Sequence, residues 1–278
     1  MSPCMSRRGE CWLKAERHNR YRLIEFGGGR EEMTYCVGIV LQDGLVMLAD
    51  TRTSAGLDDI ATFRKLHVFE QPGERLFALA TAGNLAFTQS VVGVLREGLE
   101  GENGLEKLVD QPTMFRAAQF VGRVIRHVYS TDGIALEQTG ASLDVSMLFG
   151  GQVKGRQLRL YMMYKAGNFI EATSDTPFLQ IGEHKYGKPI LDRAVTFKTE
   201  LYEGLKLALI SMDSTMRSNL GVGMPLDFVV LRRDGMEWEQ NTRIEPGEPY
   251  FHDLRERWSA ALRRAHIDIP RPPYGPKS

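Results

Sequence analysis

The sequence predicts an α+β fold in which two antiparallel sheets stack face to face and helices cover both outer sides. Three observations support it. Segments with period-two apolar alternation come in pairs, segments with a helical apolar period also come in pairs, and the two kinds of pair alternate from residue 34 onward. No internal repeat or long linker interrupts this order. The expected layer order is therefore a four-layer αββα sandwich.

The first strand pair covers residues 34–41 and 44–50. The dipeptide Asp43-Gly44 between these apolar runs is a strong turn signal. The stretch RLFALATAG predicts a further buried strand that ends at Gly83, and a helix is expected after it.

A second helix is predicted over residues 113–129, because one helical face of this segment is apolar throughout. Its apolar positions are Met114, Ala117, Ala118, Val121, Val124, Ile125 and Val128. Pro112 stands where the first turn of a helix accepts proline.

The stretch SLDVSMLFGGQVKGRQLRLYMMY predicts a second hairpin, with alternating apolar residues on either side of a glycine-rich turn. Two helices are expected near residues 187–195 and 199–216, and LDFVVLRRD predicts another strand. A helical apolar stripe near the C-terminus is best explained by a core or subunit contact. The stripe consists of Leu254, Trp258, Ala261, Leu262 and Ala265, and a proline-rich tail that should lie extended on the surface follows it.

Composition narrows the class of function. The 278 residues are 42% hydrophobic and 25% charged, typical of a soluble globular protein, and 35 basic residues balance 35 acidic ones. Without a basic surplus, neither nucleic acid nor an anionic membrane is an expected partner, and no apolar run approaches the roughly 20 residues of a membrane span. The three cysteines do not form a disulfide framework, so we expect a cytoplasmic protein. The six histidines do not have the spacing of metal ligands, and we expect neither a metal nor another cofactor.

Residues 1–33 differ from the rest of the chain. Their apolar residues follow no period and none of their apolar stretches has signal-peptide length, so the segment is predicted to be disordered and not a secretion signal. Two interpretations stay open: the segment is a propeptide, or translation begins at Met33. We favour the second, because Arg30-Glu31-Glu32 can be encoded by purine-rich codons that look like a ribosome-binding site. Removal of Met33 then makes Thr34 the first residue.

The stretch MTYCVGIVLQDGLVMLADTRTSAGLDDIATFRKL resembles the N-terminal half of proteasome β-type subunits, and most closely the bacterial proteasome-like family called Anbu, the proposed ancestral β-subunit. The likeness continues through ATAGNLAFTQ, DSTMRSNLGVG and DLRERWSAALRRAHIDIPRPP, and so covers nearly all of residues 34–278. It implies an N-terminal-nucleophile hydrolase fold and subunits that assemble into a ring or arc.

Thr34 opens the first strand directly after a methionine, where a nucleophile that uses its own α-amine as base is expected. An N-terminal threonine combines a hydroxyl nucleophile with an amine whose pKa lies near 8, which suits general-base catalysis near neutral pH. A threonine with an acylated nitrogen cannot do this chemistry. Thr34 is therefore either an ordinary strand residue or the first residue of the active chain.

Two charged residues are expected to support this nucleophile. Lys65 in FRKL matches the strand lysine of the family, whose charge lowers the pKa of the nucleophile and of the amine. Asp50 in LAD matches the acid that pairs with the lysine. An isolated aspartate and lysine fifteen positions apart would usually be surface charges, and only the family spacing favours the catalytic interpretation.

Further site residues follow from the resemblance. Gly83 corresponds to the glycine whose backbone N–H forms the oxyanion hole, a donor worth roughly 3 kcal/mol in comparable sites, although a plain turn glycine is the alternative. Thr53, Ser54 and Thr81 correspond to residues that line the substrate cleft. A small hydroxyl residue at position 81 leaves the first specificity pocket uncharged.

The second half of the chain departs from the proteasome pattern. Gly182-Glu183-His184-Lys185 stands in place of a Gly-Ser turn. Where the proteasome has an aspartate and a serine that support the threonine, RSNLGVG has Ser218 and Gly221, and Asp213 is the alternative if the alignment shifts. We therefore expect activity that is weak or selective.

The sequence as a whole predicts a threonine peptidase that cleaves peptides or proteins by acyl transfer. Two alternatives stay open: another amide hydrolase or acyl transferase on the same fold, and a catalytically silent, ring-forming scaffold that keeps the extension. The natural substrate, the ring symmetry and any ATP-dependent unfoldase partner do not follow from the sequence.

Overall fold

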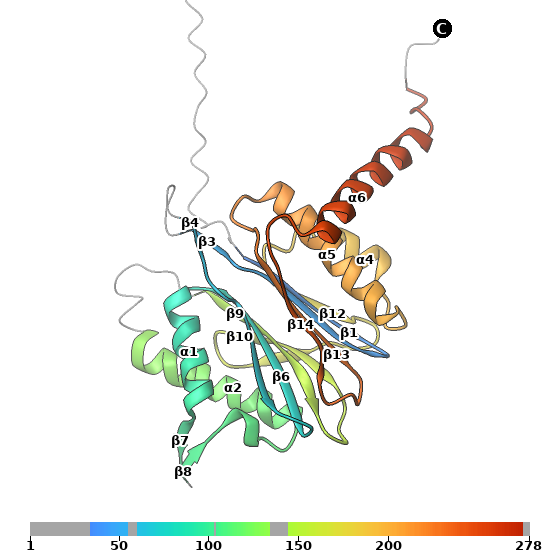
Figure 1. Ribbon diagram of the computed structural model, residues 1–278. Helices are drawn as coiled ribbons and strands as arrows, with labels where there is room; N and C mark the ends of the chain where they lie inside the picture. Colours follow the sequence, from blue (N-terminus) through green and yellow to red (C-terminus); the bar gives the residue numbers. More distant parts are fainter. Residues whose placement is uncertain (1–33, 55–59, 103, 134–143, 275–278) are drawn as a thin grey trace, which may run out of the picture. The chain divides into compact units, whose positions relative to one another are not determined.

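A computed structural model of the chain describes residues 34–54, 60–102, 104–133 and 144–274. The expected disordered extension, residues 1–33, lies outside the described residues, and so does the end of the proline-rich tail, residues 275–278. The described part contains two five-stranded antiparallel sheets and five α-helices (Figure 1). The predicted α+β class with antiparallel strand pairing is confirmed.

The first sheet has the strand order β12-β1-β2-β13-β14. Its strands are β1 (Tyr35–Leu41), β2 (Gly44–Asp50), β12 (Phe178–Gly182), β13 (Leu226–Arg232) and β14 (Trp238–Ile244). The predicted first hairpin is β1–β2, but its turn is Gln42-Asp43, since Gly44 already belongs to β2. Both strands are buried along their whole length, because helices cover one face of this sheet and the second sheet covers the other.

The second sheet has the order β11-β10-β9-β6-β5. Its strands are β5 (Leu66–Gln71), β6 (Arg75–Gly83), β9 (Val145–Val153), β10 (Arg159–Tyr164) and β11 (Phe169–Glu171). Strand β6 is the predicted RLFALATAG strand, and β9–β10 is the predicted second hairpin. Two short hairpins complete the strands: β3 (Arg52–Ser54) with β4 (Ile60–Thr62), and β7 (Leu99–Gly101) with β8 (Gly104–Glu106).

The helices are α1 (Leu85–Glu97), α2 (Met114–Val128), α4 (Lys188–Ala194), α5 (Leu201–Ser218) and α6 (Pro249–Asp268), with single turns at Leu108–Asp110 and Tyr129–Gly133. Helix α2 begins one residue later than its apolar pattern suggests. The Thr113 side chain accepts a hydrogen bond from the Arg116 amide and so caps the helix, which leaves Pro112 ahead of the cap and outside the first turn.

Three apolar clusters hold these elements together. One joins α1 and α2 to the outer face of the second sheet, and another joins α4, α5 and the base of α6 to the outer face of the first sheet. The third cluster contains inward-facing residues of both sheets, among them Met47 and Leu160. Figure 1 shows the two sheets facing each other with α1 and α2 on one side and α4 and α5 on the other. This packing brings the start of β1 and the ends of β2 and β6 close together, near one edge of the stacked sheets.

Candidate active site

Thr34 lies immediately before β1, and the β1–β2 hairpin brings it beside Asp50, the last residue of β2. The amide of Tyr35 donates a hydrogen bond of 3.1 Å to Oδ1 of Asp50. Tyr35 itself is fully buried, and its hydroxyl contacts Ser211 on α5 and the side-chain amide of Gln180 on β12. This anchored tyrosine fixes the backbone next to Thr34.

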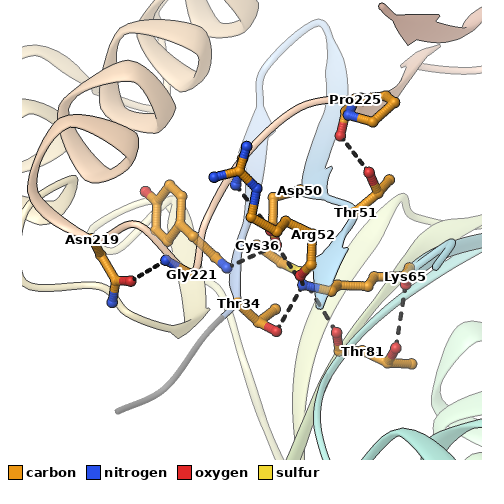
Figure 2. Close-up of polar contacts among 12 residues, drawn as sticks. Thr34, Cys36, Asp50, Thr51, Arg52, Lys65, Thr81, Asn219, Gly221 and Pro225 are labelled. Carbon is orange, nitrogen blue, oxygen red and sulfur yellow. Dashed lines mark hydrogen bonds and ion pairs between the residues drawn. The ribbon is translucent and has the colours of Figure 1, made fainter. Parts of the chain in front are cut away.

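Lys65, just before β5, links the two residues (Figure 2). Its Nζ atom lies 2.9 Å from Oγ1 of Thr34, 2.9 Å from Oδ1 of Asp50 and 2.6 Å from the carbonyl oxygen of Arg52. Thr34, Asp50 and Lys65 are all buried, at 9%, 0% and 5% exposure. The three residues proposed from the sequence as nucleophile, lysine and acid therefore form one connected, water-poor cluster.

Asp50 is held from three directions. Besides the Tyr35 amide and Lys65, the amide of Gly223 lies 3.3 Å from its Oδ2 atom. Burial raises the pKa of the Asp50 carboxyl above its usual range, while the charge of Lys65 and these hydrogen bonds oppose the shift. A buried carboxylate is costly without partners, so this set of donors is what allows a buried ion pair at the strand ends.

Gly182 and Glu183 hold the backbone of Thr34 from β12. The Glu183 amide donates a 2.7 Å hydrogen bond to the carbonyl oxygen of Thr34. Gly182 has a φ of 77°, and a Cβ atom there would lie 2.0 Å from the same carbonyl oxygen, so a larger residue does not fit. The sequence showed these residues as a departure from the proteasome turn, but it carried no signal for this contact, because backbone atoms make it.

Thr81 and Cys36 line the inner side of the cluster. The Thr81 amide donates to the Lys65 carbonyl at 3.0 Å, and the Cys36 thiol points at the Thr81 carbonyl at 3.8 Å. Burial, followed by the charge of Asp50, raises the pKa of the Cys36 thiol, so the thiol stays neutral. Cys36 therefore does not compete with Thr34 as a nucleophile.

Gly83 ends β6 two residues after Thr81, directly before the Asn84 cap of α1. Its φ is 108°, and a Cβ atom would lie 1.9 Å from the Asp144 carbonyl oxygen. The position therefore requires glycine for backbone reasons alone. An oxyanion-hole role for its N–H is compatible with that requirement and stays a prediction.

Thr53 belongs to β3, next to the Arg52 carbonyl that Lys65 contacts. Its Oγ1 atom is buried and has no hydrogen-bond partner among the described residues. The role of Thr53 in lining the substrate cleft stays a prediction. Ser54 follows Thr53 in β3, but its side chain lies outside the described part of the structure.

The two tentative supporting residues lie on α5. The carboxylate of Asp213 is fully buried, but it is bound by Arg217 at 3.1 Å and by Arg255 of α6 at 2.6 Å. Ser218 is the exposed last residue of the same helix. Asp213 thus ties two helices together, and the residue that reaches the cluster from this region is Gly223, through its backbone amide.

The described residues hold no group of three or more histidine, cysteine, aspartate or glutamate side chains with a metal-binding arrangement. Of the helices in this part of the chain, none combines the length and the apolarity that a bilayer crossing demands.

Comparisons with known proteins now place the chain. No protein-family model matches the sequence, and no curated protein does either. Among solved structures, the Anbu Gly-1 mutant from Hyphomicrobium sp. strain MC1 is 49% identical, with a TM-score of 0.79 over 86% of this chain and 98% of that chain. Anbu from Yersinia bercovieri is 45% identical, with a TM-score of 0.80 over 87% of this chain and 100% of that chain.

A third structure is described as the helical assembly of the Anbu complex from Pseudomonas aeruginosa. It is 46% identical, with a TM-score of 0.81 over 88% of this chain and 100% of that chain. Facing antiparallel sheets, with a strand-initial threonine bonded to a lysine–aspartate pair, define the class of the proteasome-like β-subunits. Within that class, the chain belongs to the Anbu family of ancestral β-subunits.

Proposed function

We propose that this chain is a proteasome-type threonine peptidase, an N-terminal-nucleophile hydrolase with a four-layer αββα sandwich in which Thr34 attacks the scissile amide. The observation that carries the proposal is the 2.9 Å contact between Nζ of Lys65 and Oγ1 of Thr34, made inside a buried cluster whose lysine is also paired with Asp50. The three apolar clusters, one between the sheets and one on each outer side, support the layer order.

The chemistry begins with a free Thr34 amine. Oγ1 adds to the amide carbonyl of the substrate while its proton passes to the α-amine, and the resulting oxyanion is stabilised by backbone N–H groups, with that of Gly83 the expected donor. Collapse of the tetrahedral intermediate breaks the C–N bond, and the proton held by the amine goes to the leaving nitrogen. Water then hydrolyses the threonine ester and regenerates the hydroxyl.

Lys65 acts on the charge that develops during this attack. Its ammonium group, held by Asp50 and by the Arg52 carbonyl, stabilises negative charge on Oγ1. Low exposure strengthens this interaction, because little water is present to screen it.

Covalent labelling tests the proposal. A threonine-directed electrophile such as a β-lactone or an epoxyketone should label a chain that begins at Thr34, and Thr34→Ala should abolish the label. A chain that keeps residues 1–33 serves as the matched control, and it should not react. If the chain that begins at Thr34 stays unlabelled, it is a scaffold and not an enzyme.

The substrate class needs a separate measurement. Peptide libraries and small amides are offered to the same preparation, and release of new amino termini is compared with release of small amines. Turnover of small amides alone would replace the peptidase with another amide hydrolase on this fold.

A further inference from the structure

A pocket of about 600 Å³ lies beside α2, on the side of the fold that α1 and α2 cover in Figure 1. Helix α2 and the start of β11 line it, together with residues of β8 and of the segment that leads to α2. Its charged lining residues are Glu106, Arg116, Arg123 and Arg126. None of them belongs to the cluster around Thr34, so the pocket is a second candidate site.

The polar face of α2 toward the pocket is basic. Residues at intervals of three, four and three positions share one face of a helix. Four lining residues follow this spacing: Arg116, Gln119, Arg123 and Arg126. Helix α2 contains no aspartate or glutamate, whereas α4, α5 and α6 each place a carboxylate four residues from a basic side chain. In a chain whose total charge is balanced, this local surplus is not neutralised within its own helix.

One of the three arginines is neutralised and two are not. Arg123 donates hydrogen bonds to both carboxylate oxygens of Glu106. Arg116 donates to the side-chain oxygen of Gln119 at 2.9 Å, and Arg126 donates to backbone carbonyl oxygens. Within the described part of the chain, neither Arg116 nor Arg126 forms an ion pair with a carboxylate. The pocket therefore carries two positive charges that the fold itself does not balance.

The backbone holds Arg126 in place at the pocket. Helix α2 approaches the β10–β11 turn so closely that a Cβ atom at Gly122 would lie 2.2 Å from the carbonyl oxygen of Gly167. Gly167 has a φ of 74°, and its carbonyl oxygen and that of Ala166 lie 3.3 and 3.4 Å from Nη1 of Arg126. A guanidinium has five N–H donors, so further donors stay available for a ligand. Neutral acceptors thus order this side chain and leave its charge unbalanced, which lowers the entropic cost of binding an anion.

The spacing of the charges favours an elongated anion. Arg123 and Arg126 lie about 4.5 Å apart along the helix axis, and Arg116 lies about 10 Å before Arg123. A single phosphate can contact only one end of this row, whereas a short polyphosphate chain carries charge and acceptor oxygens along its length. Guanidinium forks bind phosphate oxygens in pairs, and the Gln119 amide can add N–H donors because its oxygen is already bonded to Arg116. We propose that this pocket binds a linear polyphosphate chain, either free or as part of a nucleotide.

Calorimetry of the full chain tests the ligand. Tripolyphosphate should bind at an ionic strength of about 0.15 M without divalent cations, where distant surface charges are largely screened. Orthophosphate should bind at least about tenfold more weakly, because it cannot reach Arg116 and Arg126 together. Tri-glutamate should also bind at least about tenfold more weakly, since its charges are spread along a longer chain. ATP that binds as tightly as tripolyphosphate, or more tightly, assigns the pocket to nucleotides, and weaker binding of ATP assigns it to free polyphosphate.

Substitutions test the residues. Arg116→Gln and Arg126→Gln should each weaken the binding of tripolyphosphate at least about tenfold, because each removes charge-assisted hydrogen bonds. Arg193→Gln on α4 is the matched control and should stay within about twofold. Arg193 is also exposed, and it also donates to a backbone carbonyl oxygen, that of Pro189. Glu106→Gln should bind at least about threefold more tightly, because a negative charge beside the anion is gone, and a loss of folding cannot produce such a gain.

Several outcomes would overturn the proposal. They are no binding of tripolyphosphate, equal affinity for orthophosphate or tri-glutamate, a loss for Arg193→Gln as large as that for Arg126→Gln, and weaker binding by Glu106→Gln. Because the pocket and the Thr34 cluster share no residue, electrophile labelling reports separately on the proposed peptidase.

Discussion

The Nζ atom of Lys65 lies 2.9 Å from Oδ1 of Asp50, and the lysine and aspartate side chains are 6% and 0% exposed. The same Nζ atom reaches Oγ1 of Thr34. This ion pair therefore has two roles: it neutralises two buried charges, and it places a positive charge beside the proposed nucleophile. Substitutions of the lysine and of the aspartate can separate the two roles.

Replacing the lysine tests the catalytic role. Lys65→Ala should lose at least about a hundredfold in the rate of acylation at Thr34 in its folded fraction, because the charge that stabilises Oγ1 is gone. Its stability should also fall, since Asp50 is left buried without its counter-ion. Lys65→Arg should restore only part of the rate, since the planar guanidinium cannot occupy the ammonium position. The rate is followed by intact mass with the electrophile, and exposed Lys188→Ala is the control. Near wild-type acylation by Lys65→Ala removes Lys65 from the mechanism.

Replacing the aspartate tests the structural role. Asp50→Asn keeps the shape but leaves the lysine charge buried without its counter-ion, so stability should fall by about 3–5 kcal/mol in urea unfolding. Asp192→Asn breaks the exposed Lys188–Asp192 pair and should cost no more than about 1 kcal/mol. Equal losses of stability for the two variants would mean that the buried pair contributes no more to stability than the exposed pair does.

A substitution at Gly182 tests whether the backbone contact with Thr34 positions the proposed nucleophile. Gly182→Ala combines a φ of 77° with a Cβ atom 2.0 Å from the Thr34 carbonyl oxygen, so it should both destabilise the fold and slow labelling of Thr34. Gly73→Ala is matched in backbone, with a φ of 74°, but has open space around the Cβ position. It should lose some stability and keep the full labelling rate of the folded fraction.

The partly buried His67 on β5 should make the stability of the fold sensitive to acid. Burial, followed by the charges of Arg96 and Arg64, lowers the pKa of His67 to about 4, below the usual value near 6.5. Between these values the unfolded chain binds a proton that the folded chain does not, so stability is full above about pH 6.5 and falls, by up to roughly 3 kcal/mol, toward pH 4. His67→Leu should flatten this part of the urea-stability profile, and exposed His252→Gln should not.

The proposed mechanism predicts the start of the active chain. Intact-mass and N-terminal analysis of protein made from the native gene should find Thr34 first. Residues 1–33 carry seven basic and five acidic residues, so the active chain holds 35 − 7 = 28 basic and 35 − 5 = 30 acidic residues and should run slightly acidic. Mutating Met33 to a non-initiating residue distinguishes the two routes. The product should disappear if translation begins at Met33, whereas a self-cleaving precursor would still be made at full length. Peptide hydrolysis by protein that retains Met1 or Ser2 would exclude the free-amine mechanism.

Much of the fold follows from side-chain periodicity. Strands β1, β2, β6, β9, β10 and β13 and helices α2, α4 and α5 all lie within one to three residues of their predicted places. Strands β5 and β14 were not predicted, because LHVFEQ is short and WEQNTRI is polar on both faces. Both are edge strands, where one side of the ladder is open and apolar alternation is weak.

The candidate site also contains both residues that could be predicted from the sequence and residues that could not. Thr34, Asp50 and Lys65 were proposed from the residues and the family resemblance, and the structure brings them into contact. Gly182, Glu183 and Gly223 were not foreseen in their present roles, since they act through main-chain atoms that every residue type carries. Asp213 was a reasonable alternative on sequence spacing, but Arg217 and Arg255 already take up its carboxylate.

The donors around Asp50 come from parts of the chain that are synthesised far apart in time. Tyr35 and Lys65 each lie 15 positions away, whereas Gly223 lies 173 positions away, and β13, which follows it, pairs with β2. A chain emerging from the ribosome therefore has its threonine long before it has the environment that surrounds Asp50. The site is completed only after the C-terminal third has joined the first sheet, so an incomplete chain carries the nucleophile without the finished machinery around it.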